Sequence, residues 1–219
     1  GSLDGKELQI VTDASFQSSV EISNNLNITG VIAFLTGKTN VGYQNTASNT
    51  SSTAVGYENN ASGNSSSAVG RGNTASDESS SAVGYENDAS GNSSSAFGYG
   101  NTASGSNSLA IGRNNTASGG ESSFFTPSAI AVGNENTATG TASTAVGHQN
   151  TASGTDSTAV GRANVASGTG SIVVGYYNGA NHGSYSSALG RDNIADGSYS
   201  TAVGYLNRAT SESSTAVGY

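Results

Sequence analysis

Residues Ser52 to Ser65 read Ser-Thr-Ala-Val-Gly-Tyr-Glu-Asn-Asn-Ala-Ser-Gly-Asn-Ser, and variants of this 14-residue unit fill most of the 219-residue chain. The glycine at the fifth position of the unit recurs along the sequence, and ten of the twelve intervals between successive copies have this same length. The other two are a 21-residue interval, from Gly112 to Gly133, and a 15-residue interval, from Gly175 to Gly190. A fixed period of this kind predicts a repeat architecture.

The composition favours a repeat over a conventional globule. Only 33% of the residues are hydrophobic and 10% are charged, and the chain holds 31 Gly, one Pro and no Cys, Met or Trp. Small polar residues bury little apolar area against an ordering cost of about 1–2 kcal/mol per residue. A net charge of only −8, together with ten Tyr and many Val, argues against a disordered chain.

The unit divides into two related heptads, Ser-x-Ala-Val-Gly-x-x and Asn-x-Ala-Ser-Gly-x-x. A coiled coil is excluded because Gly costs about 1 kcal/mol in a helix interior and the apolar positions are mostly Ala. Short extended segments bounded by Gly turns fit better. We therefore expect each heptad to form a strand of four or five residues and a turn, so that each unit makes one coil of a parallel β-solenoid.

Neighbouring side chains on a strand point to opposite faces, so the adjacent Ala and Val of each unit form two separate columns. The small column suits the interior of a thin coil: Ala54, Ala68, Ala82, Ala96, Ala110, Ala131, Ala145, Ala159, Val173, Ala188, Ala202 and Ala216, matched in the other heptad by Ala61, Ala75, Ala89 and their successors. The larger column, named the valine column, comprises Val55, Val69, Val83, Phe97, Ile111, Val132, Val146, Val160, Val174, Leu189, Val203 and Val217. Monomers rarely expose a continuous apolar stripe, so the valine column is predicted to line an oligomer interface.

The residue after each recurring glycine forms a third column, which is rich in Tyr and Arg. It comprises Tyr43, Tyr57, Arg71, Tyr85, Tyr99, Arg113, Asn134, His148, Arg162, Tyr176, Arg191, Tyr205 and Tyr219. At a strand spacing of about 4.8 Å, Tyr and Arg stack as cation–π neighbours. The preferred interpretation is a ladder that seals the seam between subunits, and the alternative is a ligand-contact stripe for a glycan or matrix protein, formed by Tyr57, Arg71, Tyr85, Tyr99 and Arg113.

A fourth column holds twelve Asn, each three residues after a recurring glycine: Asn45, Asn59, Asn73, Asn87, Asn101, Asn115, Asn136, Asn150, Asn164, Asn178, Asn193 and Asn207. Stacked Asn amides at a solenoid corner hydrogen-bond along the axis and satisfy turn backbone, and Asn tolerates left-handed turn geometry. The alternative is N-glycosylation, because six Asn-x-Ser/Thr triplets occur, at Asn27, Asn49, Asn60, Asn64, Asn92 and Asn114. Such triplets arise by chance in a chain rich in these residues, which favours the structural interpretation.

The 21-residue interval contains a seven-residue insertion near residues 119–128, which read Gly-Gly-Glu-Ser-Ser-Phe-Phe-Thr-Pro-Ser. The length of the insertion equals one heptad. Either the insertion adds a half-coil with Phe124 in the alanine column, or it loops out and exposes Phe124 and Phe125 as a binding tip.

The residues offer no support for catalysis. Two His, no Cys and scattered carboxylates provide no repeated acid–base pair, no metal-ligand spacing and no Ser-His-Asp arrangement, so no catalytic residue, metal or cofactor is expected. The acidic net charge argues against nucleic acid as a partner. The longest apolar run, Ile28 to Leu35, is too short to cross a membrane.

Three stretches, Ser-Ser-Ala-Val-Gly (Ser66–Gly70), Ser-Leu-Ala-Ile-Gly (Ser108–Gly112) and Ser-Thr-Ala-Val-Gly (Ser157–Gly161), resemble the head repeats of trimeric autotransporter adhesins, the YadA-like head. The resemblance covers Thr39 to Tyr219. It implies a left-handed parallel β-roll and a homotrimer about a threefold axis. It also implies display on the bacterial cell surface, with outer-membrane anchoring in the full-length protein, and attachment to host matrix protein, cells, glycans or abiotic surfaces.

Two domains follow from these patterns: residues 38–219 as the β-roll, and residues 1–37 as a β segment of different character, in which Gly1-Ser2 reads as a cloning scar. The segment from Phe16 to Gly30 resembles a sequence pattern found in phage tail-fibre proteins, so a trimeric tail fibre or spike is the alternative function. An ice-binding solenoid is a third, weaker candidate, because the position before the interior Ala is too irregular for a flat Thr array. An adhesin head that binds through a repetitive surface is the function we expect.

Overall fold

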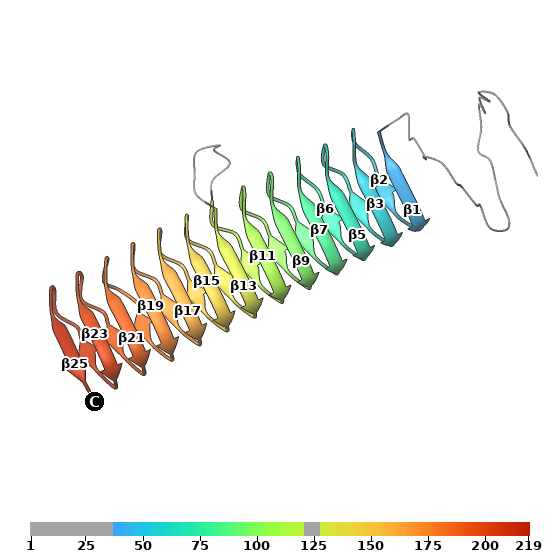
Figure 1. The fold of residues 1–219 in the computed structure, drawn as a ribbon. Helices are drawn as coiled ribbons and strands as arrows, with labels where there is room; N and C mark the ends of the chain where they lie inside the picture. The colour runs from blue at the N-terminus through green and yellow to red at the C-terminus, as the bar shows by residue number, and fades with distance from the viewer. Residues whose placement is uncertain (1–36, 121–127) are drawn as a thin grey trace, which may run out of the picture. The chain divides into compact units, whose positions relative to one another are not determined.

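The computed structural model describes residues 37–120 and 128–219, and every regular element in these ranges is a short β-strand. The chain winds between two parallel sheets, and each strand pairs with its equivalent in the next coil (Figure 1). Ala68, for example, lies opposite Ala82, which holds the same position of the following unit. The prediction of an all-β parallel solenoid with one unit per coil is confirmed.

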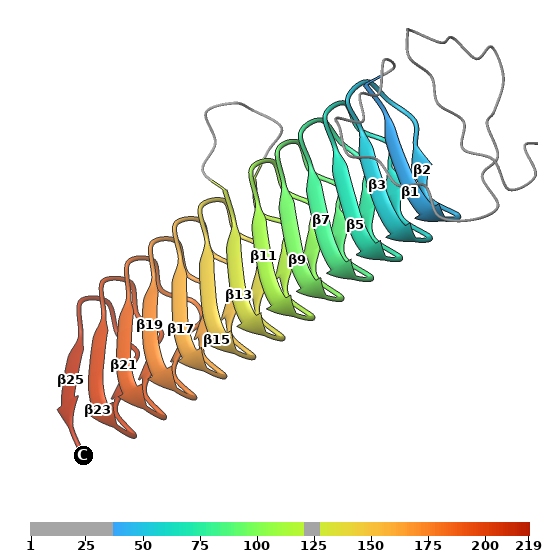
Figure 2. The same ribbon diagram turned by 45° about the vertical axis from the view of Figure 1, so that its right-hand side comes forward.

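The longer strands form a 13-stranded sheet, sheet A, whose order follows the sequence along the solenoid (Figure 2). Its strands are β1 (Thr39–Tyr43), β3 (Thr53–Tyr57), β5 (Ser67–Arg71), β7 (Ser81–Tyr85), β9 (Ser95–Tyr99), β11 (Leu109–Arg113), β13 (Ile130–Asn134), β15 (Thr144–His148), β17 (Thr158–Arg162), β19 (Ile172–Tyr176), β21 (Ser187–Arg191), β23 (Thr201–Tyr205) and β25 (Thr215–Gly218). At about 4.8 Å per strand, sheet A is about 55–60 Å long.

The shorter strands form a 12-stranded sheet, sheet B, in the same order. Its strands are β2 (Thr46–Ala47), β4 (Asn60–Ala61), β6 (Thr74–Ala75), β8 (Asp88–Ala89), β10 (Thr102–Ala103), β12 (Thr116–Ala117), β14 (Thr137–Ala138), β16 (Thr151–Ala152), β18 (Val165–Ala166), β20 (Gly179–Ala180), β22 (Ile194–Ala195) and β24 (Arg208–Ala209).

The strands of sheet B are shorter than the four or five residues expected from the sequence. The N–H groups of Ser62 and Gly63 both donate to the carbonyl oxygen of Ala75, at 2.9 and 3.3 Å. The same sharing occurs in seven other coils, and the chain leaves the sheet at this point, directly after the Ala of the strand.

The interior of the solenoid is filled by two rows of Ala side chains, as predicted. From the second coil onward, a coil contributes one small residue from each sheet, such as Ala54 and Ala61, which are both fully buried. Val173 takes the place of Ala in one coil and is also fully buried. Since Ala loses no rotamer freedom on burial and lets the two sheets approach closely, the coil is thin and its apolar core is small.

The two turns of each coil depend on residues in the left-handed region of the backbone. In one coil these are Glu58, with φ of 54°, and Ser65, with φ of 55°. Although Asn tolerates this conformation, the residue before Asn59 takes it and Asn59 does not. The bend at Glu58 turns the Asn59 side chain into the coil, where it is buried.

The coils on either side of the 21-residue interval are direct neighbours in both sheets. β11 pairs directly with β13, and β12 pairs directly with β14. The alanine column passes from Ala110 to Ala131, so the interpretation that places Phe124 in that column is wrong. Phe124 and Phe125 lie outside the described residues, as do the strands expected between residues 1 and 36.

Candidate functional site

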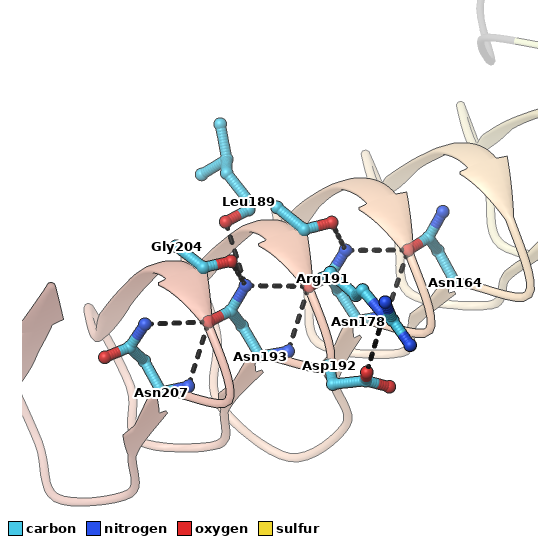
Figure 3. A network of polar contacts seen from close by, with 9 residues as sticks. Asn164, Asn178, Leu189, Arg191, Asp192, Asn193, Gly204 and Asn207 are labelled. Atoms are coloured by element: carbon cyan, nitrogen blue, oxygen red, sulfur yellow. Dashed lines mark hydrogen bonds and ion pairs between the residues drawn. The ribbon is translucent and has the colours of Figure 1, made fainter. Parts of the chain in front are cut away.

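The twelve column asparagines form a continuous ladder on the inside of the first turn. Nδ2 of Asn73 donates to Oδ1 of Asn59 at 2.9 Å, and the backbone N–H of Asn73 donates to the same oxygen at 3.1 Å. Nδ2 of Asn73 also lies 3.0 Å from the carbonyl oxygen of Val69 and 2.8 Å from that of Gly84. Figure 3 shows the same pattern near the C-terminus in Asn164, Asn178, Asn193 and Asn207. The structural interpretation of this column is therefore confirmed, and its amides are occupied within the coil.

The valine column lies on the outer face of sheet A. Ala54 is fully buried, whereas Val55 beside it is half-buried in the single chain. The side chain of Val174 is 37% exposed. Strand register adds Val41, which lies opposite Val55 and is 49% exposed, to the set found from the sequence.

The apolar stripe continues through both irregular coils. Ile111 lies opposite Val132 across the insertion, and Val174 lies opposite Leu189 across the 15-residue coil. Figure 3 shows Leu189 projecting outward from its strand. The column is thus one unbroken apolar face along sheet A, available to a partner.

The Tyr and Arg side chains stack into a ladder, as predicted from their spacing. The guanidinium carbon of Arg71 lies 5.4 Å from the ring centroids of both Tyr57 and Tyr85. The rings of Tyr85 and Tyr99 are 5.1 Å apart and nearly parallel, and Arg113 follows 5.6 Å from Tyr99. Because the ring faces contact ladder neighbours, mainly ring edges and hydroxyl groups remain for any other partner.

This ladder borders the valine column along the solenoid. Tyr57 follows Val55 by two residues on β3, and both lie outside the coil that Ala54 fills. A partner that covers the valine column would therefore have the ladder at its rim. This position favours the predicted seam ladder over a separate ligand stripe.

Glu86 raises the pKa of Tyr85 above its ordinary value. The carboxylate accepts a hydrogen bond from the Tyr85 hydroxyl, and its negative charge disfavours the phenolate. Burial raises the pKa of Tyr85 further, while the nearby charge of Arg71 lowers it.

Sheet B presents a face of hydroxyl groups that the sequence interpretation did not single out. Thr102 and Ser104 flank the buried Ala103 and point outward, because side chains alternate along a strand. The arrangement recurs in the next three coils, in Thr116 and Ser118, Thr137 and Thr139, and Thr151 and Ser153. These eight residues, named the hydroxyl face, are half-buried or exposed. The signal in the sequence was the Thr-Ala-Ser triplet of the second heptad.

The described ranges contain no group of three or more His, Cys, Asp or Glu side chains placed to hold a metal ion. In the same ranges, no helix is long and apolar enough to span a membrane. An open polar hollow is lined by Asp77, Ser90, Asn92 and Ser104. Its lining includes one carboxylate and no basic side chain, so it offers no acid–base pair.

A family model described as the YadA head domain repeat, which spans two copies of the unit, matches almost the whole solenoid. The matched ranges are 41–59, 61–87, 89–115, 103–123, 127–150, 152–178, 182–207 and 195–219. No curated protein gave a significant match to the chain. The comparisons do not support the alternative of a phage tail fibre. Since the matched ranges cover well over half of the sequence, the chain belongs to the YadA head domain repeat family, whose β-solenoids are adhesin-type heads rather than enzymes.

Proposed function

We propose that three copies of this chain pack through their valine columns and form the attachment head of a bacterial cell-surface protein, anchored in the outer membrane in its full-length form. The observation that supports the trimer is the unbroken apolar face on sheet A. A coil buries only two Ala inside, which is little apolar area against the cost of ordering the whole coil. Burial of one further large apolar side chain per coil at a subunit interface stabilises both the coil and the assembly.

Aspartate at Val69, Val146 and Val203 tests this interface. The triple variant should lose the trimer, because three unpaired charges would enter the apolar seam. A matched control carries Thr74→Asp, Thr151→Asp and Arg208→Asp in the same coils on sheet B, and it should keep the trimer. Sedimentation equilibrium gives the mass of each variant. A folded, monodisperse monomer of the unmodified protein would contradict the proposal.

Attachment is proposed to occur along the repetitive outer surface rather than in a single pocket. The hydroxyl face lies on sheet B and the valine column on sheet A, so a trimer closed through sheet A leaves the hydroxyl face to a partner. Equivalent coils offer equivalent contacts, and three chains multiply weak binding through effective concentration. A matrix protein, a glycan or an abiotic surface with periodic groups fits such an array.

Removal of residues 56–83, which make up two complete coils, tests distributed attachment. The remaining coils stay in register, and binding to a matrix-coated surface should weaken gradually while the trimer persists. The Phe124→Ser, Phe125→Ser variant tests the alternative, a binding tip at the insertion. Complete loss of attachment by this folded trimer would show that the tip, and not the array, holds the ligand.

A further inference from the structure

Three departures from the repeat occur together at the second turn of neighbouring coils near the C-terminus. Gly170 takes the left-handed position of one turn, and Tyr185 and Tyr199 take the same position in the next two coils. The coil between Gly175 and Gly190 also has one extra residue, and it lies at this turn, around Asn181 and His182. Residues that serve the repeat recur in every coil, so a local group of exceptions points to another role.

The two tyrosine rings form an exposed stack. Their centroids are 5.5 Å apart with an interplanar angle of 13°, and Tyr185 and Tyr199 are 57% and 60% exposed. A Cβ atom at Gly170 would lie 2.6 Å from Cδ1 of Tyr185, so the absence of a side chain at Gly170 makes room for the first ring. In the following coil Ser213 holds the equivalent position, so no third ring covers the outer face of Tyr199.

The backbone at both tyrosines is strained. Their φ values are 55° and 58°, a region that costs an L-residue other than Gly, Asn or Asp about 1–2 kcal/mol. Hydrogen bonds hold the strained turns, from the N–H of Tyr185 to the Thr169 carbonyl at 2.7 Å and from the N–H of Tyr199 to the Ser184 carbonyl at 2.8 Å. The same φ and an equivalent hydrogen bond occur in other coils, for example at Ser65, so the repeat holds the backbone and the two tyrosines alter only the side chain that this turn presents.

Polar groups flank the rings on the same turns. Oδ1 of Asp196 accepts a hydrogen bond from the N–H of Asn181 at 3.0 Å and lies 3.8 Å from Nδ1 of His182. Asp196 and His182 each precede a stacked tyrosine by three residues. The carboxylate of Asp196 therefore accepts a hydrogen bond from the turn that contains the extra residue. This contact holds the turn beside the tyrosine rings.

We propose that Tyr185 and Tyr199 form a binding site for a neutral glycan, with a pyranose ring stacked on the open face of Tyr199. The apolar area is limited to two rings among Ser, Thr and Gly, which is small for a protein interface but matches the apolar face of one sugar. Ser213 takes the equivalent turn position in the following coil, on the side of the open face of Tyr199, and can offer its hydroxyl group to the sugar. The carboxylates of Asp196 and Glu212 disfavour a polyanionic glycan. The site rests on the proposed attachment function for its biological role and adds a ligand class to it.

The test measures binding of the whole 219-residue protein to hexamers of β-1,4-linked glucose, N-acetylglucosamine and mannose, with a hyaluronan hexamer as the anionic probe. Isothermal titration calorimetry should detect at least one neutral hexamer and no hyaluronan. Tyr185→Asn and Tyr199→Asn should each weaken that binding about tenfold or more, and Asn keeps the left-handed backbone. Tyr177→Asn is the matched control, because Tyr177 has φ of 54° and is 53% exposed at the other turn.

Thermal unfolding of each variant verifies that the solenoid is intact. Absence of binding to all three neutral hexamers, a preference for hyaluronan, or an equal loss in the Tyr177→Asn control would overturn the glycan site. Attachment of the unmodified protein to a matrix-coated surface is measured in parallel. If the unmodified protein attaches to the matrix-coated surface but binds no hexamer, only the glycan site is refuted. If it neither attaches to the surface nor binds a hexamer, the result also contradicts the proposed function.

Discussion

Asn136 donates from its backbone N–H and from its Nδ2 to Oδ1 of Asn115, at 3.0 Å in each case, although 21 residues separate the two along the chain. Equivalent bonds join asparagines 14 residues apart in the regular coils. The ladder is therefore unaffected by the seven-residue insertion. It makes the first turn the common structural element of the coils, while the second turn accepts the changes in length.

Asn150→Ala should lower the free energy of unfolding by about 2–4 kcal/mol. The change removes the hydrogen bonds from the Asn150 side chain to the Val146 and Gly161 carbonyls and from the Asn164 N–H to the Asn150 side chain. Urea unfolding followed by circular dichroism measures the effect. The exposed Asn64→Ala serves as control and should change the free energy by less than about 0.5 kcal/mol. Equal effects of the two substitutions would show that the ladder adds nothing to stability.

Gly147→Ala should destabilise the solenoid by about 3 kcal/mol or more. Gly147 has φ of 123°, and a Cβ atom there would lie 2.0 Å from the carbonyl oxygen of Gly161 in the next coil. The control is Gly72→Asn, because φ at Gly72 is 64° and the nearest atom to an added Cβ is Cγ of Glu86 at 3.5 Å. That variant should stay within about 0.5 kcal/mol of the parent. An unchanged melting temperature for Gly147→Ala would refute the close approach of the two strands.

Ala163→Gly should raise stability by about 0.5–1 kcal/mol. Ala163 holds a left-handed turn position with φ of 54°, and glycine relieves about 1–2 kcal/mol of backbone strain against a smaller cost in unfolded-state entropy. The companion variant Ala159→Gly, at a fully buried strand position, should be less stable than the parent. Differential scanning calorimetry distinguishes the two, and a lower melting temperature for Ala163→Gly would contradict the strain.

Glu86→Gln should lower the pKa of Tyr85 toward its ordinary value, because the substitution removes the negative charge that disfavours the phenolate. The folded protein holds this proton more tightly than the unfolded chain, so the contribution of Tyr85 to stability is present below about pH 10 and is lost as pH rises through the folded-state pKa. NMR titration of the tyrosine ring signals follows the change. The control substitution Glu78→Gln should leave the pKa of Tyr85 unchanged. If Glu86→Gln also leaves the pKa of Tyr85 unchanged, the contact between Tyr85 and Glu86 is refuted.

The sequence was sufficient to predict contacts that repeat. In a solenoid, each residue lies beside its equivalent in the next unit. The repeat period in the sequence therefore predicts which residues are neighbours in space. The buried Ala54 file, the amide ladder through Asn59 and the stacking of Arg71 with its tyrosine neighbours all follow from that rule and from strand alternation. The outward position of Val55 follows in the same way, because Ala54 fills the interior.

Tertiary structure decided what the period leaves open. Glu58, and not Asn59, takes the left-handed conformation, because backbone geometry at a turn depends on where the neighbouring side chain must hydrogen-bond. The strands of sheet B end after two residues, and in eight coils two successive N–H groups share one carbonyl oxygen at that point. The stack of Tyr199 on Tyr185 likewise needs the space above Gly170. The sequence alone determined which residues become neighbours from coil to coil, whereas the local backbone conformation and the occupied volume at each turn arise only in the folded chain.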